Sequence, residues 1–342
     1  MGEAEAWITR GDGRLERAPI AVPEPGAGEL EVDVLACGVC RTDLHVIDGE
    51  LPPHRSPVVP GHQVVGRVTA LGPGVRRARV GDLVGIAWLR STCGACAWCR
   101  SGRENLCPDA TFTGWDADGG YASIATVPEA FAYALPADAD PLAVAPLLCA
   151  GIIGYRALRR ANLPAGGRLG LYGFGSSAHL TARLAMAQGA TVFAMTRGEA
   201  NRALARELGL DFVGDEREAP PEPLDAAIVF APAGGLVPVA LEATTRGGTV
   251  VLAGIHMTDV PAMTYGDHLF LERDLRTVTA NTRGDGDEFL RVALGLGLSP
   301  SVTPYPFERA DEAVDDLRSG RASGSLVLVR RDAASEPTPP RR

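Results

Sequence analysis

The sequence predicts an α/β protein in which a β-rich part is followed by a doubly wound parallel sheet. Residues 1 to about 150 are rich in Gly and Pro and contain short alternating runs at 29–35 and 66–71, which is typical of β structure. From residue 165 onward, short apolar runs alternate with segments of helical periodicity, and this indicates parallel strands joined by helices. The length of 342 residues fits two domains.

The second part divides into strands and helices in a regular order. Buried strands are predicted at 168–172, 191–195, 226–230 and 249–253, and helices at 180–187 and 199–208. Near residue 284 the pattern changes, and a further helix is followed by a last strand candidate at 326–329.

Composition and charge exclude several function classes. All 33 basic residues are Arg and none is Lys, which removes Schiff-base chemistry and the phosphate-binding Lys of nucleotide hydrolases. The net charge of −9 and pI near 5.3 argue against a nucleic-acid partner. No signal peptide is recognisable, and the longest apolar stretch, 141–155, contains two prolines and is too short for a membrane span. We expect a cytoplasmic protein with reduced thiols.

Four closely spaced cysteines form the sharpest motif. Cys93, Cys96, Cys99 and Cys107 can surround one tetrahedral Zn²⁺, and because four thiolates fill every position, the zinc would be structural. An iron–sulfur cluster or unrelated buried cysteines are the alternatives.

A second set of metal-binding residue types is dispersed along the chain. Cys40, His62 and Cys149 would leave a fourth zinc position open, as a catalytic site requires. Taken singly, His62 reads as a hydrogen-bonded turn residue and Cys149 as a small buried hydrophobe. Cys40 can also pair with Cys37 as a redox motif.

A glycine-rich turn follows the predicted strand 168–172 and opens a predicted helix. Its residues are Gly173, Phe174, Gly175, Ser176, Ser177 and Ala178. The glycines allow a tight turn and close approach of a pyrophosphate, which the helix N-terminus would bind. The alternative is a strand–helix turn with no ligand. After the next strand, Thr196 stands where NAD enzymes carry an acid, and Arg197 could bind a 2′-phosphate, so NADP is favoured over NAD.

These motifs together resemble the zinc-containing medium-chain alcohol dehydrogenases. The resemblance rests on the run 37–45, the Pro60-Gly61-His62 turn, the four-cysteine lobe, the run Pro146–Gly151 and the glycine-rich turn, and it covers roughly residues 20–330. It implies a GroES-like catalytic domain at 1–150 with the zinc lobe at 93–107, a Rossmann domain at 151–283, and a return to the catalytic domain at 284–332. It also implies a homodimer or homotetramer. The Pro-containing tail at 333–342 is expected to be disordered.

The resemblance assigns roles residue by residue. Cys40, His62 and Cys149 would bind the catalytic zinc, Asp43 would orient His62, and Thr42 and His45 would relay the proton. Two departures are Gln63, where many relatives carry Glu, and Ser325, where relatives often have an Arg. Arg41 would therefore take more of the pyrophosphate contact. The nicotinamide half would be lined by Ala231, Gly254 and Ile255, and the substrate pocket by Trp88 and Trp115, which could equally be core aromatics.

The expected function is reversible hydride transfer between a small or planar primary alcohol, or its aldehyde, and NAD(P). Two zinc ions per chain are implied, one catalytic and one structural. The alternatives are a reductase of an imine, conjugated alkene or quinone on the same fold, and a zinc- or redox-responsive binding protein.

Overall fold

The computed structural model describes residues 2–51, 54–321 and 324–330, so the expected disordered tail at 333–342 lies outside the described residues. The chain forms two compact units. The first contains residues up to Cys149, Thr282–Gly286 and the segment from Ser301 onward, and the second contains Ala150–Asn281 and Asp287–Pro300.

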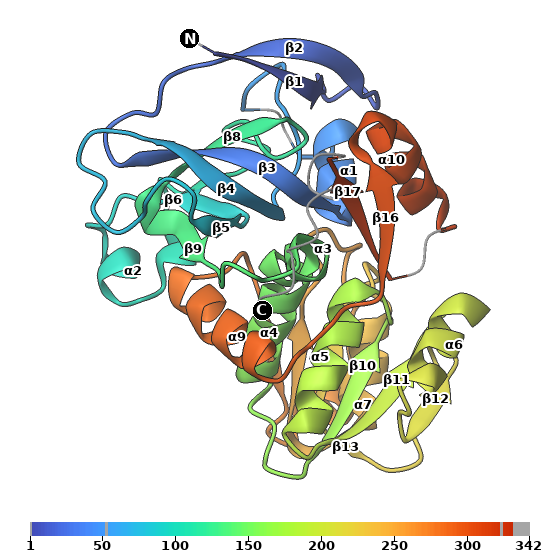
Figure 1. Ribbon diagram of the computed structural model, residues 1–342. Coiled ribbons are helices and arrows are strands. Elements are labelled where there is room, and N and C mark those ends of the chain that lie inside the picture. The colour runs from blue at the N-terminus through green and yellow to red at the C-terminus, as the bar shows by residue number, and fades with distance from the viewer. Residues whose placement is uncertain (1, 52–53, 322–323, 331–342) are drawn as a thin grey trace, which may run out of the picture. The chain divides into compact units, whose positions relative to one another are not determined.

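The first unit is built on a sheet in which β3 (Glu29–Val39) is paired on both sides; Figure 1 draws β3 in blue and the C-terminal strands of this sheet, β16 and β17, in red. The strand order is β16-β17-β3-β4-β5-β9, and β8 pairs with residues 29–33 of β3, next to the stretch 36–39 that pairs with β17. The other strands of this sheet are β4 (Val64–Leu71), β5 (Leu83–Ile86), β8 (Ile124–Pro128), β9 (Ala132–Ala134), β16 (Val302–Pro306) and β17 (Ser325–Val329). Alternate residues of β3 are buried, as period-two patterning predicts.

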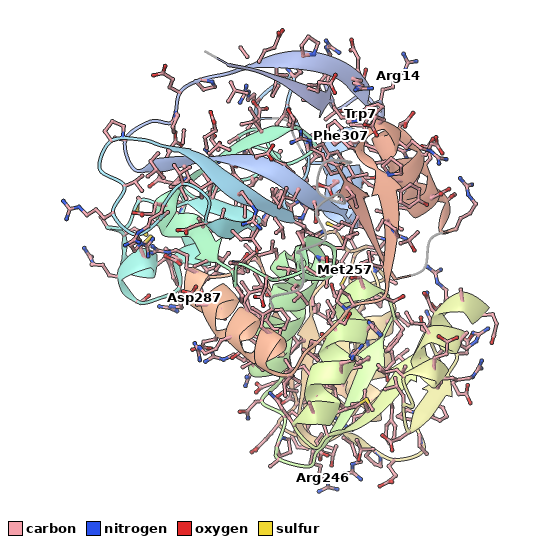
Figure 2. The ribbon with its side chains drawn as sticks, viewed as in Figure 1. Trp7, Arg14, Arg246, Met257, Asp287 and Phe307 are labelled. Carbon is pink, nitrogen blue, oxygen red and sulfur yellow. The ribbon has the colours of Figure 1, made fainter. Side chains whose placement is uncertain are left out.

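Shorter elements complete the first unit. The hairpin of β1 (Gly2–Ile8) and β2 (Glu16–Val22) is joined to the C-terminal segment, because the Trp7 indole N–H donates to the Phe307 carbonyl over 2.9 Å (Figure 2). The remaining pieces are β6 (Leu89–Ser91), β7 (Thr111–Phe112), α1 (Arg41–Ile47), α2 (Ala97–Arg100), α3 (Pro141–Val144) and α10 (Ala310–Ser319), with 3₁₀ turns η1 (Glu104–Leu106), η2 (Glu129–Phe131), η3 (Ala145–Leu148) and η4 (Phe307–Arg309).

The second unit confirms the predicted doubly wound parallel sheet. Its strand order is β12-β11-β10-β13-β14-β15 with every pair parallel, which is the Rossmann order. The strands are β10 (Arg168–Tyr172), β11 (Thr191–Met195), β12 (Phe212–Gly214), β13 (Leu224–Val229), β14 (Thr244–Leu252) and β15 (Asp274–Thr277). The helices are α4 (Ala150–Ala161), α5 (Ser176–Ala187), α6 (Glu199–Glu207), α7 (Leu236–Ala243), α8 (Tyr265–His268) and α9 (Arg283–Gly295).

The segment 287–300 lies with the second unit, whereas the sequence placed everything after residue 284 with the first. The reason is side-chain packing against α4. Glu288 accepts from the Tyr155 hydroxyl over 3.0 Å and pairs with Arg159 at 2.5 Å, and a Cβ at Gly151 would lie 2.3 Å from the Phe289 ring. Between Thr282 and Pro300, only Thr282–Gly286 belongs to the first unit.

No single helix among the described residues is long and apolar enough to cross a membrane. Two consecutive helical segments, 141–148 and 150–161, are together long and apolar enough by length and composition only, but the chain bends between them.

Glu104 and Arg283 form the ion pair that ties 282–286 to the first unit. The Arg283 backbone N–H and Nε donate to Oε1 of Glu104 over 2.8 and 3.0 Å, and the guanidinium lies over the Phe131 ring. The Glu104 side chain is only 8% exposed. Burial raises the pKa of Glu104, but hydrogen bonds and charge from Arg283 outweigh it and hold that pKa below its usual value.

We predict that Arg283→Gln lowers the stability of the first unit by about 1–3 kcal/mol at neutral pH, because it leaves a buried carboxylate poorly paired. A carboxyl whose pKa is lowered by folding stabilises above its unfolded pKa and loses that effect as the pH falls through its folded pKa. The gap in thermal unfolding midpoint between wild type and variant should therefore shrink below about pH 4. An equal gap at pH 7 and pH 3.5 would contradict this explanation.

Candidate metal centres and dinucleotide-binding turn

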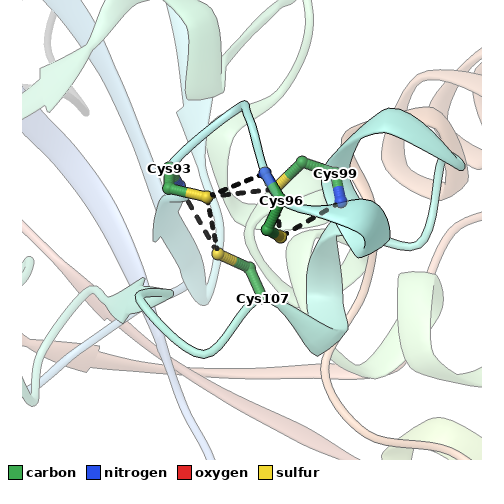
Figure 3. A group of neighbouring side chains, drawn as sticks. All are labelled: Cys93, Cys96, Cys99 and Cys107. Atoms are coloured by element: carbon green, nitrogen blue, oxygen red, sulfur yellow. Dashed lines mark hydrogen bonds between the residues drawn. The ribbon is translucent and has the colours of Figure 1, made fainter.

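The four clustered cysteines converge on one point in the lobe formed around α2 and η1 (Figure 3). The Sγ atoms of Cys93 and Cys107 are 3.5 Å apart, those of Cys96 and Cys99 3.5 Å, and those of Cys93 and Cys99 3.9 Å. Sulfurs around a tetrahedral zinc with 2.3 Å bonds lie about 3.8 Å from one another. The four thiols are therefore already arranged as a closed tetrahedral ligand set.

Backbone N–H groups donate to sulfurs of this cluster and prepare Cys93 to act as an anion. The N–H of Cys96 donates to the Cys93 sulfur over 3.3 Å, and the N–H of Cys93 to the Cys107 sulfur over 3.4 Å. Hydrogen bonds from Ala95 and Cys96 lower the pKa of Cys93 to about 7. Thiolates are the form that binds zinc, so this turn chemistry favours metal binding.

The structure also brings together the three dispersed residues Cys40, His62 and Cys149. Their potential ligand atoms lie within 4.8 Å of one another, with Cys40 Sγ 3.2 Å from His62 Nε2. Cys40 directly precedes α1, His62 lies in the segment leading into β4, and Cys149 follows η3. Sequence spacing gave no means of joining Cys149 to the other two.

Asp43 holds two of these ligands in place. One oxygen of its buried carboxylate accepts from the Cys40 backbone N–H over 2.8 Å. The other accepts from the Gly61 N–H and lies near His62 Nδ1, both at 3.1 Å. A hydrogen bond at Nδ1 leaves Nε2, which faces Cys40, as the nitrogen available to a metal.

The electrostatics of the cluster suit a cation. A hydrogen bond from Cys149 is the largest effect on Cys40, and with the charge of His62 it lowers the pKa of Cys40 well below its usual value. Burial lowers the pKa of His62, but the charges of Cys40 and Asp43 outweigh burial and raise that pKa to about 10. A buried site that holds this much negative charge favours a positive ion.

The neighbouring candidates occupy different positions. Thr42 is buried in the first turn of α1, and His45 lies one turn further along, bonded to Glu50. Cys37 is buried in β3 and is not among the grouped ligands. Gln63 is buried with its side chain against Gly38.

Trp88 and Trp115 belong to one aromatic cluster next to His62. The Trp88 ring meets the His62 ring edge-on at 4.9 Å and is parallel to Trp115 at 6.0 Å. Sequence reasoning missed two members, Phe112, which stacks on Trp88 at 5.1 Å, and His54, which stacks on Trp115 at 4.1 Å. Their signal, an aromatic residue three positions before Trp115 and a histidine in a proline-rich loop, was too general to single out.

The glycine-rich turn lies at the carboxyl end of β10 and opens α5. Gly173 has a φ of +87°, and an added Cβ would lie 2.8 Å from the Ala231 nitrogen, so a larger residue does not fit. An added Cβ at Gly175 would meet nothing within 4 Å, which leaves open space over the helix N-terminus. Ala178 is fully buried. Gly173 and Ala231 thus lie together at the strand ends, where dinucleotides bind in this fold.

The remaining cofactor candidates are placed as follows. Phe174 is buried and its N–H donates to the Thr196 hydroxyl over 3.1 Å. Ser176 and Ser177 form the first turn of α5, and Gly254 and exposed Ile255 follow β14. Arg41, at the start of α1, and Ser325, at the start of β17, belong to the other unit.

The end of β11 has a second arginine beside it that the sequence did not suggest. Thr196 is buried, and exposed Arg197 pairs with Glu216 at 3.2 Å. Arg202, which sequence reasoning missed, donates to the Thr196 carbonyl over 3.2 Å and pairs with Asp215 at 3.4 Å. Arg202 lies one helical turn into α6. The sequence alone does not indicate that the first turn of this helix lies beside the end of β11.

Comparison with known proteins gives matches over nearly the whole chain. Residues 26–137 match the model for the alcohol dehydrogenase GroES-like domain, and residues 178–294 match the model for the zinc-binding dehydrogenase. A probable alcohol dehydrogenase, AdhA, of Mycobacterium tuberculosis is 55% identical over 93% of this chain and 93% of its own length.

Two solved structures are similar in fold. A cinnamyl alcohol dehydrogenase of Sorghum bicolor is 28% identical, with a TM-score of 0.88 over 99% of this chain and 100% of its own. Acetophenone reductase of Geotrichum candidum, solved in complex with NAD, is 27% identical, with a TM-score of 0.87 over 96% of this chain and 98% of its own.

We predict that Cys107→Ser reduces the zinc content of the purified chain by about one ion, because three thiolates hold a structural zinc far less tightly than four. Elemental analysis gives the metal content, and the thermal unfolding midpoint should fall with it. Cys37→Ser is the matched control, since it removes a thiol outside both ligand groups and should leave the zinc content unchanged. Equal zinc in wild type and Cys107→Ser would contradict the assignment.

Proposed function

The chain belongs to the zinc-containing medium-chain alcohol dehydrogenases and is an NAD(P)-dependent alcohol dehydrogenase. From this premise we propose which role each residue of the site has in the reaction and which alcohols the enzyme accepts. The observation that carries the proposal is the convergence of Cys40, His62 and Cys149 beside the buried carboxylate of Asp43. Three ligands leave one position of a tetrahedral metal open to substrate.

The donor set fits zinc at both sites. When bound, zinc is a Lewis acid that makes an alcohol hydroxyl more acidic, and the nicotinamide takes the hydride. Cys40, His62 and Cys149 would hold the catalytic ion, and Asp43 would keep His62 in the required tautomer. The four cysteines from Cys93 to Cys107 would hold the structural ion.

Thr42 and His45 would move the hydroxyl proton. Thr42 is buried two residues after Cys40 and offers a hydroxyl that can accept and donate at once. His45 lies on the same short helix and has an imidazole ring that can accept a proton at one nitrogen and donate one from the other. At the glycine-rich turn, the backbone N–H groups at the start of α5 would bind the cofactor pyrophosphate.

The aromatic cluster supports a small or planar primary alcohol, or its aldehyde, as substrate. Trp88, Phe112 and Trp115 stack on one another close to His62 and would present flat ring surfaces to a substrate there. Flat walls accept a planar substrate and crowd a branched one. The cinnamyl alcohol dehydrogenase is named for a planar primary alcohol, which supports this choice, whereas the acetophenone named in the other relative is a planar ketone.

The preference for NADP over NAD is supported at the end of β11. Thr196 offers no carboxylate to repel a 2′-phosphate, and Arg197 and Arg202 supply guanidinium groups nearby. Their carboxylate partners are Glu216 for Arg197, and Glu199 and Asp215 for Arg202; ion pairs of partly exposed side chains are weak enough for a phosphate to replace them. Arg is suited to phosphate recognition because its donors match the phosphate oxygens.

We also propose a homo-oligomer, a dimer or a tetramer, in a cytoplasmic setting. In the described part of the chain, β15 is an edge strand of its sheet, and Tyr265, Phe270 and Leu275 are exposed nearby in sequence. An open edge beside exposed apolar side chains is a common site of self-association. A reducing compartment would keep the thiols available as ligands.

The experiment that tests the proposed function is a turnover screen of the zinc-loaded enzyme with NAD and NADP against primary, secondary and aromatic alcohols. We expect planar primary alcohols to give the highest kcat/KM. Trp88→Ala should extend activity toward bulkier alcohols, because it removes one wall. An unchanged profile in that variant would remove Trp88 from the pocket.

For the cofactor, we predict that Thr196→Asp lowers kcat/KM for NADP by about tenfold, since a new carboxylate would repel the 2′-phosphate by ~1–2 kcal/mol. The same variant should retain or gain activity with NAD, which serves as the internal control. Equal losses with both cofactors would argue against this recognition site.

A further inference from the structure

The carboxylate of Glu50 hydrogen-bonds Nδ1 of His45 at the far end of α1. The His45 side chain is 15% exposed and that of Glu50 is 49% exposed, so the pair runs from a mostly covered imidazole to a carboxylate in solvent. We propose that Glu50 is a positioning residue for the proton relay, which fixes the tautomer of His45 and completes the path of the proton to water. This inference rests on the relay role proposed for His45.

Glu50 is not a free surface side chain that happens to reach His45, because the turn that carries it is held at several points. Gly49 has a φ of +72°, and an added Cβ would lie 2.5 Å from the Gly11 carbonyl oxygen. The N–H of Leu51 donates to the His45 carbonyl over 3.1 Å. These constraints return the chain directly over the last turn of α1.

The neighbouring carboxylate, Asp48, is engaged elsewhere. Its Oδ1 pairs with Arg318 of α10 at 2.8 Å, and the Gly13 N–H from the β1–β2 loop donates to the Ile47 carbonyl over 2.8 Å. Asp48 therefore anchors the end of α1 to α10, while Glu50 faces the imidazole. The two carboxylates of this turn have separate tasks.

The contact determines which ring nitrogen of His45 can accept a proton. When Nδ1 carries its hydrogen and donates to the carboxylate, Nε2 has the free lone pair. In alcohol oxidation the substrate loses a hydride to the nicotinamide and one proton from its hydroxyl. Nε2 gains that proton while Nδ1–H stays bonded to Glu50, and His45 then returns one proton to bulk water. In aldehyde reduction the same proton moves inward.

The test compares Glu50→Gln, His45→Gln and the double variant in the zinc-loaded full chain. Single-turnover oxidation of a primary alcohol is followed by NAD(P)H absorbance, and proton release by a pH-indicator dye, so that slow cofactor release does not mask the effect. Glu50→Gln keeps the size of the side chain and removes the charge. We expect it to slow both signals by about tenfold, the lower end of losses seen for groups that orient a catalytic side chain.

Three further readouts separate a positioning role from a structural one. The alcohol concentration at half-maximal rate and the zinc content should stay within twofold of wild type, because Glu50 touches neither substrate nor metal. Glu50→Asp should recover part of the rate. In the His45→Gln background, adding Glu50→Gln should cause no further loss, since the carboxylate acts through that imidazole. Glu5→Gln, an exposed carboxylate paired with Arg17 on the β1–β2 hairpin, is the control for loss of surface charge.

The outcomes separate the role of Glu50 from the relay role of His45 and from the proposed substrate class. If His45→Gln is slow but Glu50→Gln matches wild type, or if the two losses add in the double variant, the role of Glu50 is refuted and the relay stands. If His45→Gln is as fast as wild type, the relay and the role of Glu50 fail together. Absence of alcohol turnover in the wild type would overturn the proposed substrate class and this inference with it.

Discussion

The buried carboxylate of Asp43 is the constraint on which the metal centre of the first unit depends. It accepts hydrogen bonds from the backbone N–H groups of Cys40 and Gly61 and lies against Nδ1 of His62. One side chain thereby fixes the start of α1 relative to the turn that precedes β4. A buried carboxylate without donors costs several kcal/mol, so the three N–H groups also explain why this charge is tolerated in the interior.

Much of the fold followed from local pattern. β10 and β11 have the bounds that the apolar runs predicted, because strands buried on both faces read as continuous hydrophobic segments. β14 begins at Thr244, five residues before the predicted start at 249, since Thr245, Arg246 and the two glycines that follow interrupt the apolar run. The helix at 310–319 and the strand at 302–306 were not predicted, because their apolar residues are few and their sequence is dominated by charge and proline.

In the candidate site, too, some residues could be predicted from the sequence and others could not. Cys93, Cys96, Cys99 and Cys107 were predictable as a group because fifteen residues contain all four ligands. The proximity of Cys149 to Cys40 depends on how the whole chain between positions 40 and 149 folds into the sheet. Only the resemblance to a family suggested it. Glu50 escaped sequence reasoning for another reason: a carboxylate five positions after a histidine does not face it on a helix, and here it does so because the chain turns back at Gly49.

The pairing of β3 with β17 has a consequence for how the chain is made. β17 lies beside β3 in the sheet of the first unit, yet one ends at Val39 and the other begins at Ser325. Ribosomes add ~5–20 residues per second, so the nascent β3 waits roughly 15–60 s for this neighbour. Throughout that interval residues 36–39 of β3 have no partner on this edge, although β8 covers residues 29–33, and unpaired edges are templates for aggregation. The second unit, which ends at Pro300, is synthesised in full before β17, so it can be completed before the first unit although the first unit begins earlier in the chain.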